Sequence, residues 1–401
     1  MELFKLSLIF LVIIVVMALR KPLPLAILAG IISTVLLYRL PLDTILQLVW
    51  IGSTNWSTIS VLLILYLVTF LQRILEMRDQ LRSAQQDLNG VFNNNRLNAS
   101  LSSIFIGLLP SAAASIICAE IVDRSCGDYL DKDEKGFVTS FYRHIPESFL
   151  PTYSTVIIMA GLCKVPIVSF VVGMIPMAIT LYLIGYFLFL RRVPRKTGAP
   201  PSESRRRDFI SLLKHLWSLI LVVVLIMAFQ MEVYAAVGIT IALSLLVYRI
   251  KPSELRSIFI SAMEGKVLLG SYLVMVLKEF VSYTGAIYAL PEVFSHLPIP
   301  DFLIFALIFF FGSVASGSQA IIAIGTPLAF TAIPNGGMPL MVLLMSYAYA
   351  AMQLSPLHIC LMVISEWFEI PPAGLIKKTI LPVCIFCAAA LAYYLLLIRI
   401  L

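Results

Sequence analysis

Long apolar runs separated by short polar segments extend over the whole chain. Residues 8–18 and 167–190 contain no charged residue, and they lack the alternation of polar and apolar positions typical of outer-membrane barrel strands. A membrane-crossing helix needs about 20 mostly apolar residues. The pattern therefore predicts ten spans, at residues 3–19, 22–40, 57–76, 137–163, 166–191, 211–229, 231–249, 265–285, 338–366 and 374–399.

Two further apolar segments, near residues 101–124 and 302–333, are interrupted by small and polar residues at their centres. This pattern predicts a helix, a break and a second helix, as in a re-entrant hairpin. The predicted fold is an all-α polytopic membrane protein with two inverted repeats, each holding five transmembrane helices, one re-entrant hairpin and a broken helix after the hairpin. The predicted divisions are a first repeat at 1–192 (scaffold 1–98, hairpin and broken helix 99–192), a cytoplasmic basic linker at 193–214, and a second repeat at 215–401 (scaffold 215–298, hairpin and broken helix 299–401).

Composition supports this class of protein. Of the 401 residues, 60% are hydrophobic and 13% charged, with a mean hydropathy of +0.97, whereas a soluble chain is about half apolar and a quarter charged. An ordinary soluble domain, a disordered chain and a nucleic-acid-binding protein are excluded. Membrane lipid is instead the expected surroundings.

The net charge of +7 is best interpreted as a topology signal, because basic residues in short loops stay in the cytoplasm. The basic segment 191–214 is therefore placed inside, which puts both termini outside. Of the 29 Lys and Arg residues, all but Lys5, Arg39, Lys164, Lys278 and Arg399 then fall in inside segments, one of which extends from Arg73 to Arg143. The predicted location is the cytoplasmic (inner) membrane, crossed many times.

The two halves match weakly at a nearly constant offset. Tyr38-Arg39 matches Tyr248-Arg249 (249 − 39 = 210), and Gly107 matches Gly312 (312 − 107 = 205). Pro151 and Pro166 match Pro356 and Pro371 at the same offset of 205. Because each half has an odd number of spans, such a repeat must be inverted.

Each half also has a span interrupted by proline after its hairpin, from His144 to Thr155 and from Gln353 to His358. Proline removes a backbone donor and clashes with the preceding turn, and unpaired backbone groups are tolerated in a bilayer where they are buried in protein or line a cavity. One such break alone is ordinarily a kink satisfied by a neighbouring serine. Two breaks at equivalent positions, beside hairpins with small hydroxylated tips, favour a binding site near the midplane, where helix termini can bind ions. The predicted substrate-binding residues are Pro110, Ser111, Ser115, Pro151, Thr152, Tyr153, Ser154, Thr155, Ser316, Gly317, Ser318, Gln319, Ser355, Pro356 and His358.

Ionisable residues inside spans are usually functional. Glu147 lies within the first break and could carry a proton or pair with Arg143. Further candidates for proton or cation coupling are Glu120, Asp123 and Glu366, although Glu120 and Asp123 could instead pair with Arg124 at the cytoplasmic face. His358 could titrate or serve as a neutral hydrogen-bond partner.

No motif indicates an enzyme. Cys384 and Cys387 form a C-x-x-C inside an apolar run, where packing is favoured over a redox or metal site. The chain has no P-loop, dinucleotide fingerprint, metal-ligand spacing or nucleophile elbow. No catalytic residue, resident metal or cofactor is predicted, apart from Na⁺ or H⁺ as a coupling ion.

The segments Leu108-Leu109-Pro110-Ser111-Ala112-Ala113-Ala114-Ser115 and His144-Ile145-Pro146-Glu147-Ser148 resemble an uncharacterised branch of the ion transporter superfamily of secondary carriers. That superfamily includes gluconate permeases, divalent-anion and citrate carriers, arsenite pumps and some sodium/proton antiporters. The resemblance implies a homodimer that moves its substrate by an elevator mechanism, with the first three spans of each half as scaffold. The Ser-Asn-Thr hairpin signature of sodium-coupled dicarboxylate carriers is absent, which leaves sodium coupling and a dicarboxylate substrate open.

The sequence thus predicts a secondary active transporter that moves a small, organic anion by elevator-type alternating access, coupled to protons or sodium. The alternatives are a cation/proton antiporter and a transporter of lipid substrates.

Overall fold

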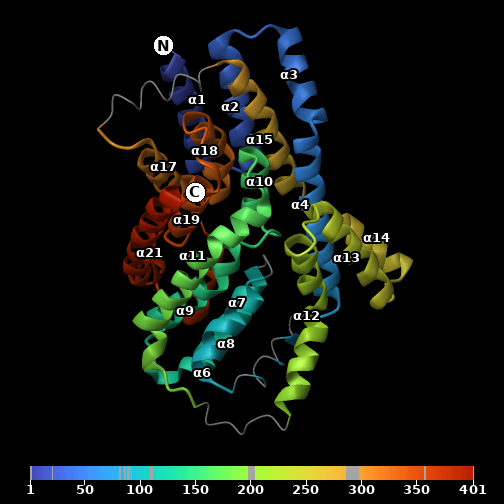
Figure 1. Cartoon of the computed structure of the whole chain (residues 1–401), viewed down its shortest axis with the longest axis vertical. Helices are drawn as coiled ribbons and strands as arrows, with labels where there is room; N and C mark the ends of the chain where they lie inside the picture. The colour runs from blue at the N-terminus through green and yellow to red at the C-terminus, as the bar shows by residue number, and fades with distance from the viewer. Residues whose placement is uncertain are drawn as a thin grey trace.

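The computed structural model (Figure 1) describes residues 2–19, 21–80, 83–84, 87, 91, 93–108, 112–196, 204–285, 298–355 and 358–400. These residues form α-helices and a few short 3-10 and π segments, and they contain no strand. The prediction of an all-α protein is confirmed for this part of the chain.

The first half is a series of helices with one irregular stretch between α9 (Lys132–His144) and α10 (Ser154–Cys163). In order these are α1 (Glu2–Ala18), α2 (Leu23–Tyr38), α3 (Leu42–Thr54), α4 (Trp56–Met77), α6 (Asn95–Leu97), a π segment (Asn98–Ser102), α7 (Ser103–Ile106), α8 (Ala112–Cys126), a 3-10 turn (Gly127–Tyr129), α9 (Lys132–His144), a 3-10 turn (Ile145–Ser148), α10 (Ser154–Cys163), α11 (Ile167–Leu188) and a 3-10 turn (Leu190–Arg192).

The second half is also a series of long and short helices. It contains α12 (Arg205–Met227), α13 (Val233–Val247), α14 (Pro252–Ser261), α15 (Gly265–Tyr283), α17 (Asp301–Ser316), α18 (Ser318–Ala332), α19 (Gly337–Met352), α20 (Ile359–Phe368) and α21 (Pro372–Ile400).

Four described helices, α4, α11, α12 and α21, are long and apolar enough to cross a membrane, and the pair α14 and α15, bent by 50°, would add a fifth span. Several shorter helices, among them α2, α13 and α19, are also apolar. Large apolar side chains are exposed along α2 and α11, for example Leu36 and Phe187. Exposed apolar side chains of this size are costly in water, so the helices are compatible with a membrane protein.

Among the described helices, α3 and α14 lie outside both the predicted spans and the predicted hairpins. α3 and α14 have 13 and 10 residues, which is too short to produce a hydropathy signal of spanning length. α14 projects from one side of the molecule (Figure 1), and its N-terminal Glu254 forms an ion pair with Arg78 at the end of α4, with a distance of 2.9 Å.

The helices form two packed groups (Figure 1). In the first, α2 packs against α15, α4 against α13, α3 against α15 and α14 against α4. In the second, α8 packs against α9 and α20, α18 against α10 and α19, and α11 against α21. The pairs α4–α10, α15–α18 and α1–α17 join the two groups.

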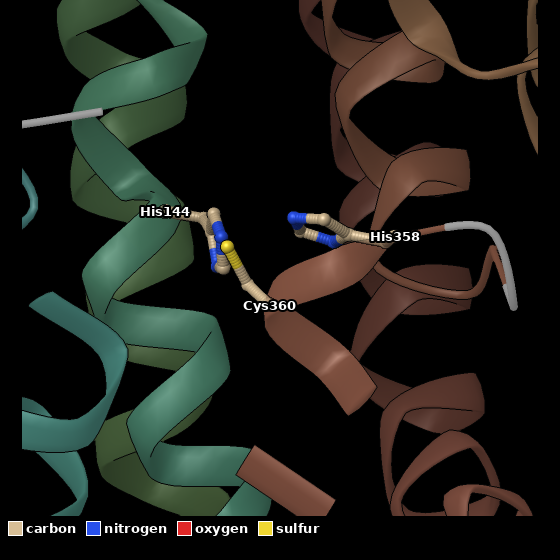
Figure 2. A group of neighbouring side chains, drawn as sticks. All are labelled: His144, His358 and Cys360. Atoms are coloured by element: carbon tan, nitrogen blue, oxygen red, sulfur yellow. The ribbon is translucent and has the colours of Figure 1, made fainter. Parts of the chain in front are cut away.

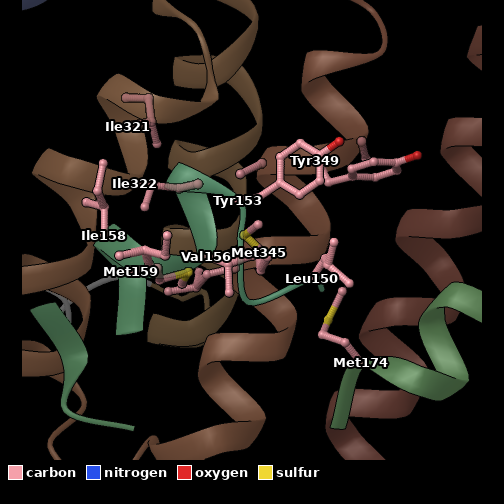
Figure 3. Close-up of a cluster of buried hydrophobic side chains, with 14 of the residues drawn as sticks. Leu150, Tyr153, Val156, Ile158, Met159, Met174, Ile321, Ile322, Met345 and Tyr349 are labelled. Carbon is pink, nitrogen blue, oxygen red and sulfur yellow. The ribbon is translucent and has the colours of Figure 1, made fainter. Parts of the chain in front are cut away.

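The core of the second group is drawn in Figure 3. Val156 and Met159 of α10 lie among Ile322 of α18, Met345 of α19 and Met174 of α11. All five side chains are buried. This apolar packing holds the irregular stretch before α10 against helices of the second half.

Several helices end in a left-handed residue that is not glycine. Arg39 and Arg249 follow α2 and α13 with φ of 50° and 49°, and Lys164 and Glu369 follow α10 and α20 with φ of 58° and 57°. An αL residue at this position is a common way to end a helix. The first pair is separated by 210 positions and the second by 205, the two offsets at which the halves match in sequence.

Candidate functional site

The first break separates α9 from α10. The 3-10 turn Ile145–Ser148 follows directly on α9, and residues 149–153 then run as an irregular stretch to α10. Pro146 stands at the start of the 3-10 turn, where its missing donor is not needed. The carbonyl of Pro146 accepts from the amides of Phe149 and Leu150, and Pro151 is buried within the stretch.

The second break separates α19 from α20. α19 ends at Met352, and the amides of Leu354 and Ser355 donate to carbonyls of its last turn before α20 begins at Ile359. The hydroxyl of Ser355 donates to the carbonyl of Val314 at 3.0 Å. This bond attaches the second break to α17, the first arm of the second hairpin.

Between the arms of that hairpin, Gly317 has a φ of 87°. Residues with a Cβ rarely adopt this conformation. The glycine therefore permits the direct turn from α17 into α18.

The two breaks lie side by side. The rings of His144 and His358 lie edge to face with centroids 4.5 Å apart (Figure 2), and the hydroxyl of Ser140 donates to Oε1 of Gln353 at 3.3 Å. One half of the chain supplies His144 and Ser140, and the other supplies His358 and Gln353. The structure thus brings the predicted residue His358 against the first break.

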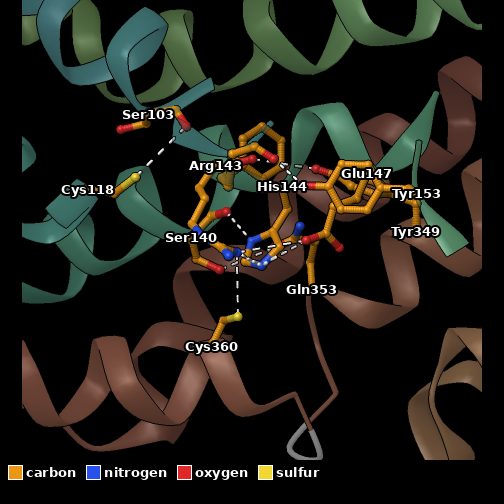
Figure 4. A network of polar contacts seen from close by, with 12 residues as sticks. Ser103, Cys118, Ser140, Arg143, His144, Glu147, Tyr153, Tyr349, Gln353 and Cys360 are labelled. Carbon is orange, nitrogen blue, oxygen red and sulfur yellow. Dashed lines mark hydrogen bonds and ion pairs between the residues drawn. The ribbon is translucent and has the colours of Figure 1, made fainter. Parts of the chain in front are cut away.

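Arg143 lies at the centre of this contact, with 1% of its surface exposed (Figure 4). Its Nη1 atom is 2.7 Å from Nε2 of His144, 3.4 Å from Sγ of Cys360 and 3.8 Å from Oε1 of Glu147. A buried charge is expensive unless it is paired and hydrogen-bonded. Among these three neighbours, Glu147 is the carboxylic acid that can balance the charge of Arg143.

The tautomer of His144 follows from its own contacts. Its Nδ1 lies 2.5 Å from the carbonyl of Ser140, which can only accept, so Nδ1 carries the proton and donates. Nε2 then keeps its lone pair, which accepts from the Arg143 guanidinium. The ring is fully buried and fixed in orientation by both bonds.

The first hairpin is held tightly against the first break. The hydroxyl of Tyr153 donates to the carbonyl of Gly107. A Cβ placed on Gly107 would lie only 2.8 Å from the carbonyl carbon of Arg143, and closer still to its oxygen. No other residue type fits here without moving one of the two backbones.

Several buried polar atoms around the breaks and hairpins have no hydrogen-bond partner among the described residues. They are Oγ of Ser115, Oγ of Ser313, Nε2 of Gln319, Nε2 of Gln353 and Nδ1 of His358. Buried polar groups are nearly always satisfied, so each exception needs an explanation such as a water molecule or a ligand. Their placement on both hairpins and the second break is consistent with a polar binding region.

The other predicted binding residues are placed less closely. Thr152 is half-buried and lines an apolar groove against α12, away from the histidine pair, while Ser154 and Thr155 are half-buried at the start of α10. Ser318 is buried at the start of α18. Pro110, Ser111 and Pro356, together with the side chain of Ser316, lie outside the described residues.

Of the four coupling candidates, Glu147 is the one adjacent to the histidines and Arg143. Its side chain is 17% exposed and lies 3.8 Å from Nε2 of His144. Glu120 forms an ion pair with Arg124 at 2.5 Å and is exposed. Asp123 pairs with Lys135 at 2.8 Å, and Glu366 is exposed near the end of α20.

Sequence reasoning missed Arg143, Cys360 and Gln353. Arg143 was assigned to a cytoplasmic segment by the charge count, but its guanidinium is buried between the two breaks. One signal was present, because Arg143 falls within the predicted span 137–163, where a charge is usually functional. Cys360 was not singled out, because sequence spacing alone does not bring it near His144.

Comparison with known proteins assigns the chain to a family. No curated protein matches the chain. A family described as "Protein of unknown function (DUF401)" matches residues 3–398. Because this match covers nearly the whole sequence, the chain belongs to the DUF401 family.

Proposed function

We propose that this protein is a secondary transporter of a small anion, and that the anion binds to Arg143 where the two broken helices meet. The buried guanidinium of Arg143 is the observation that carries the proposal. Glu147 is the proposed coupling residue for protons, and the protein moves its substrate by an elevator mechanism in the cytoplasmic membrane.

The guanidinium of Arg143 supports an anionic substrate, because it is a buried cation at the contact between the two breaks. An incoming carboxylate or oxyanion could accept from the guanidinium in the bidentate manner that arginine favours. The amide of Gln353 and the imidazole of His358 would offer it further polar contacts.

The packing of the helices supports two inverted repeats. α8 of the first hairpin packs against α20, and α18 of the second hairpin packs against α10, so each hairpin contacts the broken helix of the other half. The pairs α2–α15 and α4–α13 exchange partners in the same way. The left-handed residues that end α2 and α13, and α10 and α20, agree with a repeat at these offsets.

The division into two groups of helices supports the elevator mechanism. α2, α4, α13 and α15 would form the scaffold, and the hairpins with the broken helices would form the moving unit. α12 packs against α13 of the scaffold, and an apolar groove of about 320 Å³ separates α12 from Phe105, Leu108, Leu150 and Thr152 of the moving unit. Apolar contacts without specific hydrogen bonds present little resistance to sliding.

Binding of anions to the purified protein tests the proposal. A ligand that binds only the folded state raises apparent stability, so the unfolding temperature would be measured with monocarboxylates, dicarboxylates, sugar acids and inorganic oxyanions. We expect a stabilising anion whose effect is abolished in Arg143→Gln and reduced in Arg143→Lys, which keeps the charge but loses the planar fork.

The matched control is Arg124→Gln, because Arg124 is exposed and paired with Glu120 on the first hairpin. This variant should respond to the anion as the wild type does. The proposal is refuted if no anion stabilises the protein, or if a folded Arg143→Gln variant binds the anion with unchanged affinity.

A further inference from the structure

We propose that His144, His358 and Cys360 form a binding site for a soft or borderline transition-metal ion such as Zn²⁺. The metal would connect the first broken helix to the second. The proposal of a metal site does not depend on the proposed transport function. Only the expected effect of the metal on transport rests on that function.

The three ligand atoms already converge. One atom from each of the three side chains lies within 4.8 Å of the other two, and Figure 2 shows the two imidazoles and the thiol turned toward a common point. Zinc binds nitrogen at about 2.0–2.1 Å and sulfur at about 2.3 Å, so ligand atoms around a tetrahedral ion are separated by about 3.3–3.8 Å. Closing the site therefore requires a contraction of roughly 1 Å, which side-chain rotation can supply.

His144 has the hydrogen-bonding state that a ligand needs. Histidines that bind metals almost always donate their other ring N–H to a carbonyl or carboxylate, and Nδ1 of His144 makes this bond to the carbonyl of Ser140. Its Nε2 therefore presents a lone pair. Nδ1 of His358 is buried and has no hydrogen-bond partner among the described residues.

The ligand set determines the class of metal. Two neutral imidazoles and one thiolate favour Zn²⁺, Co²⁺, Ni²⁺ or copper, whereas Ca²⁺ and Mg²⁺ prefer oxygen ligands. Three protein ligands leave the fourth tetrahedral position open for water or another small molecule. Cys360 must lose its thiol proton to solvent as the sulfur–metal bond forms, so one proton is released for each ion bound.

Arg143 and the metal exclude each other. The guanidinium Nη1 is 2.7 Å from Nε2 of His144 and 3.4 Å from Sγ of Cys360, and it donates to the lone pairs that the metal would use. When the metal binds, the guanidinium must leave these two atoms. The carboxylate of Glu147, 3.8 Å from the same nitrogen, is an acceptor within reach.

Two consequences follow for transport. A bound ion would tie His144 of one half to His358 and Cys360 of the other and so hold the two breaks together. It would also move the guanidinium that binds the anion. Metal and anion should therefore compete, and the metal should inhibit transport.

Co²⁺ is the probe, because a thiolate bound to it gives an intense charge-transfer absorption in the near ultraviolet and tetrahedral geometry gives strong visible bands. Titration of the purified full-length protein in detergent should give both signals and saturate at one equivalent, and Zn²⁺ should displace the cobalt. Cys360→Ser should abolish the charge-transfer band. His358→Gln should weaken binding by about tenfold or more.

The matched control is Cys163→Ser, because this half-buried cysteine in α10 contacts Met341 and takes no part in the site. It should leave the cobalt spectrum unchanged. Arg143→Gln should bind cobalt more tightly than the wild type, since it removes the competing cation. A charge-transfer band that persists in Cys360→Ser, or a wild type that shows no tetrahedral cobalt spectrum, would overturn the proposal.

A second measurement does not depend on the folding of a variant. In the wild type, bound Zn²⁺ should slow maleimide labelling of Cys360 and leave labelling of the half-buried Cys163, at the end of α10, unchanged, as quantified by peptide mass spectrometry. Equal labelling rates at Cys360 with and without Zn²⁺ would also overturn the proposal. A cobalt spectrum in a protein that binds no anion would refute the transport function while leaving the metal site standing.

Discussion

Replacing Gly107 with alanine tests the contact that holds the first hairpin against the first break. A Cβ at Gly107 would lie 2.8 Å from the carbonyl carbon of Arg143, whereas carbon atoms in contact are usually about 3.5–4.0 Å apart. The carbonyl oxygen of Arg143 would be closer still, so the two backbones would have to separate by more than about 1 Å. That movement would also break the hydrogen bond from Tyr153 to the Gly107 carbonyl.

The expected cost can be estimated from these two losses. Forcing an extra methyl group into a packed interior typically costs about 1–3 kcal/mol, and a lost hydrogen bond adds about 1 kcal/mol. Gly107→Ala should therefore lower the free energy of unfolding by about 2–4 kcal/mol. Tyr153→Phe, which removes only the hydrogen bond, should lower it by about 1 kcal/mol.

Gly312→Ala is the matched control, because Gly312 is the residue that corresponds to Gly107 in the sequence comparison of the halves. There a new Cβ would overlap a side chain and not a backbone carbonyl, because it would lie 2.6 Å from Cγ1 of Ile321 and closer still to Cδ1, and alanine is the better helix former by about 1 kcal/mol. Its loss of stability should therefore be smaller than that of Gly107→Ala. Unfolding by denaturant in mixed micelles, followed by tryptophan fluorescence, measures all three variants.

The reasoning is refuted if Gly107→Ala is as stable as Gly312→Ala. Such a result would mean that the backbone of α7 does not approach that of Arg143 as closely as the structure describes. A large loss in Gly107→Ala with no loss in Tyr153→Phe would assign the whole effect to steric overlap.

Two further predictions concern carboxylates at opposite ends of α9. If Glu147 carries the coupled proton, Glu147→Gln should remove the pH dependence of anion uptake into proteoliposomes. Glu120→Gln, which changes an exposed ion pair, should retain that dependence. An unchanged pH profile in Glu147→Gln would exclude the proton-carrying role. Asp131 caps α9 by accepting from the amide of Glu134, so Asp131→Ala should lower the free energy of unfolding by about 1 kcal/mol, and Asp131→Asn by less. Burial acts to raise the pKa of Asp131, but the ion pair with Lys378 and the bond from the Glu134 amide outweigh it and hold this pKa below its ordinary value. The ionised carboxylate of Asp131 therefore stabilises the fold above about pH 4. This stabilisation is lost as the pH falls through the lowered pKa. Unfolding curves measured across pH should show it in the wild type and not in either variant.

The helical spans could be predicted because a hydropathy signal depends only on local composition. α4, α11, α12 and α21 lie where continuous apolar runs predicted them. The interruption after α9 was predicted from Pro146 and Pro151, since proline acts on its own backbone whatever its surroundings. Short helices such as α3 give no comparable signal, and their presence had to be learned from the structure.

The composition of the site was less accessible to sequence reasoning because it depends on contacts between distant segments. Arg143 looks like any basic residue near a cytoplasmic loop until α20 is placed beside it. Cys360 likewise acquires chemical significance from its distance to Arg143, a residue 217 positions earlier. His358 was found because it lies directly beside a proline break, which marks it locally.

The exchange of partners between α8 and α20, and between α18 and α10, has a consequence for biosynthesis. α8 ends at Cys126, whereas α20 begins at Ile359, so the first hairpin leaves the ribosome long before the helix that completes its packing. Its buried surface must wait in the bilayer, covered by lipid or by a chaperone of the insertion machinery, until synthesis is nearly finished. Stalling translation in the segment between the two halves should therefore leave a first half that is inserted but easily cleaved by protease around α8.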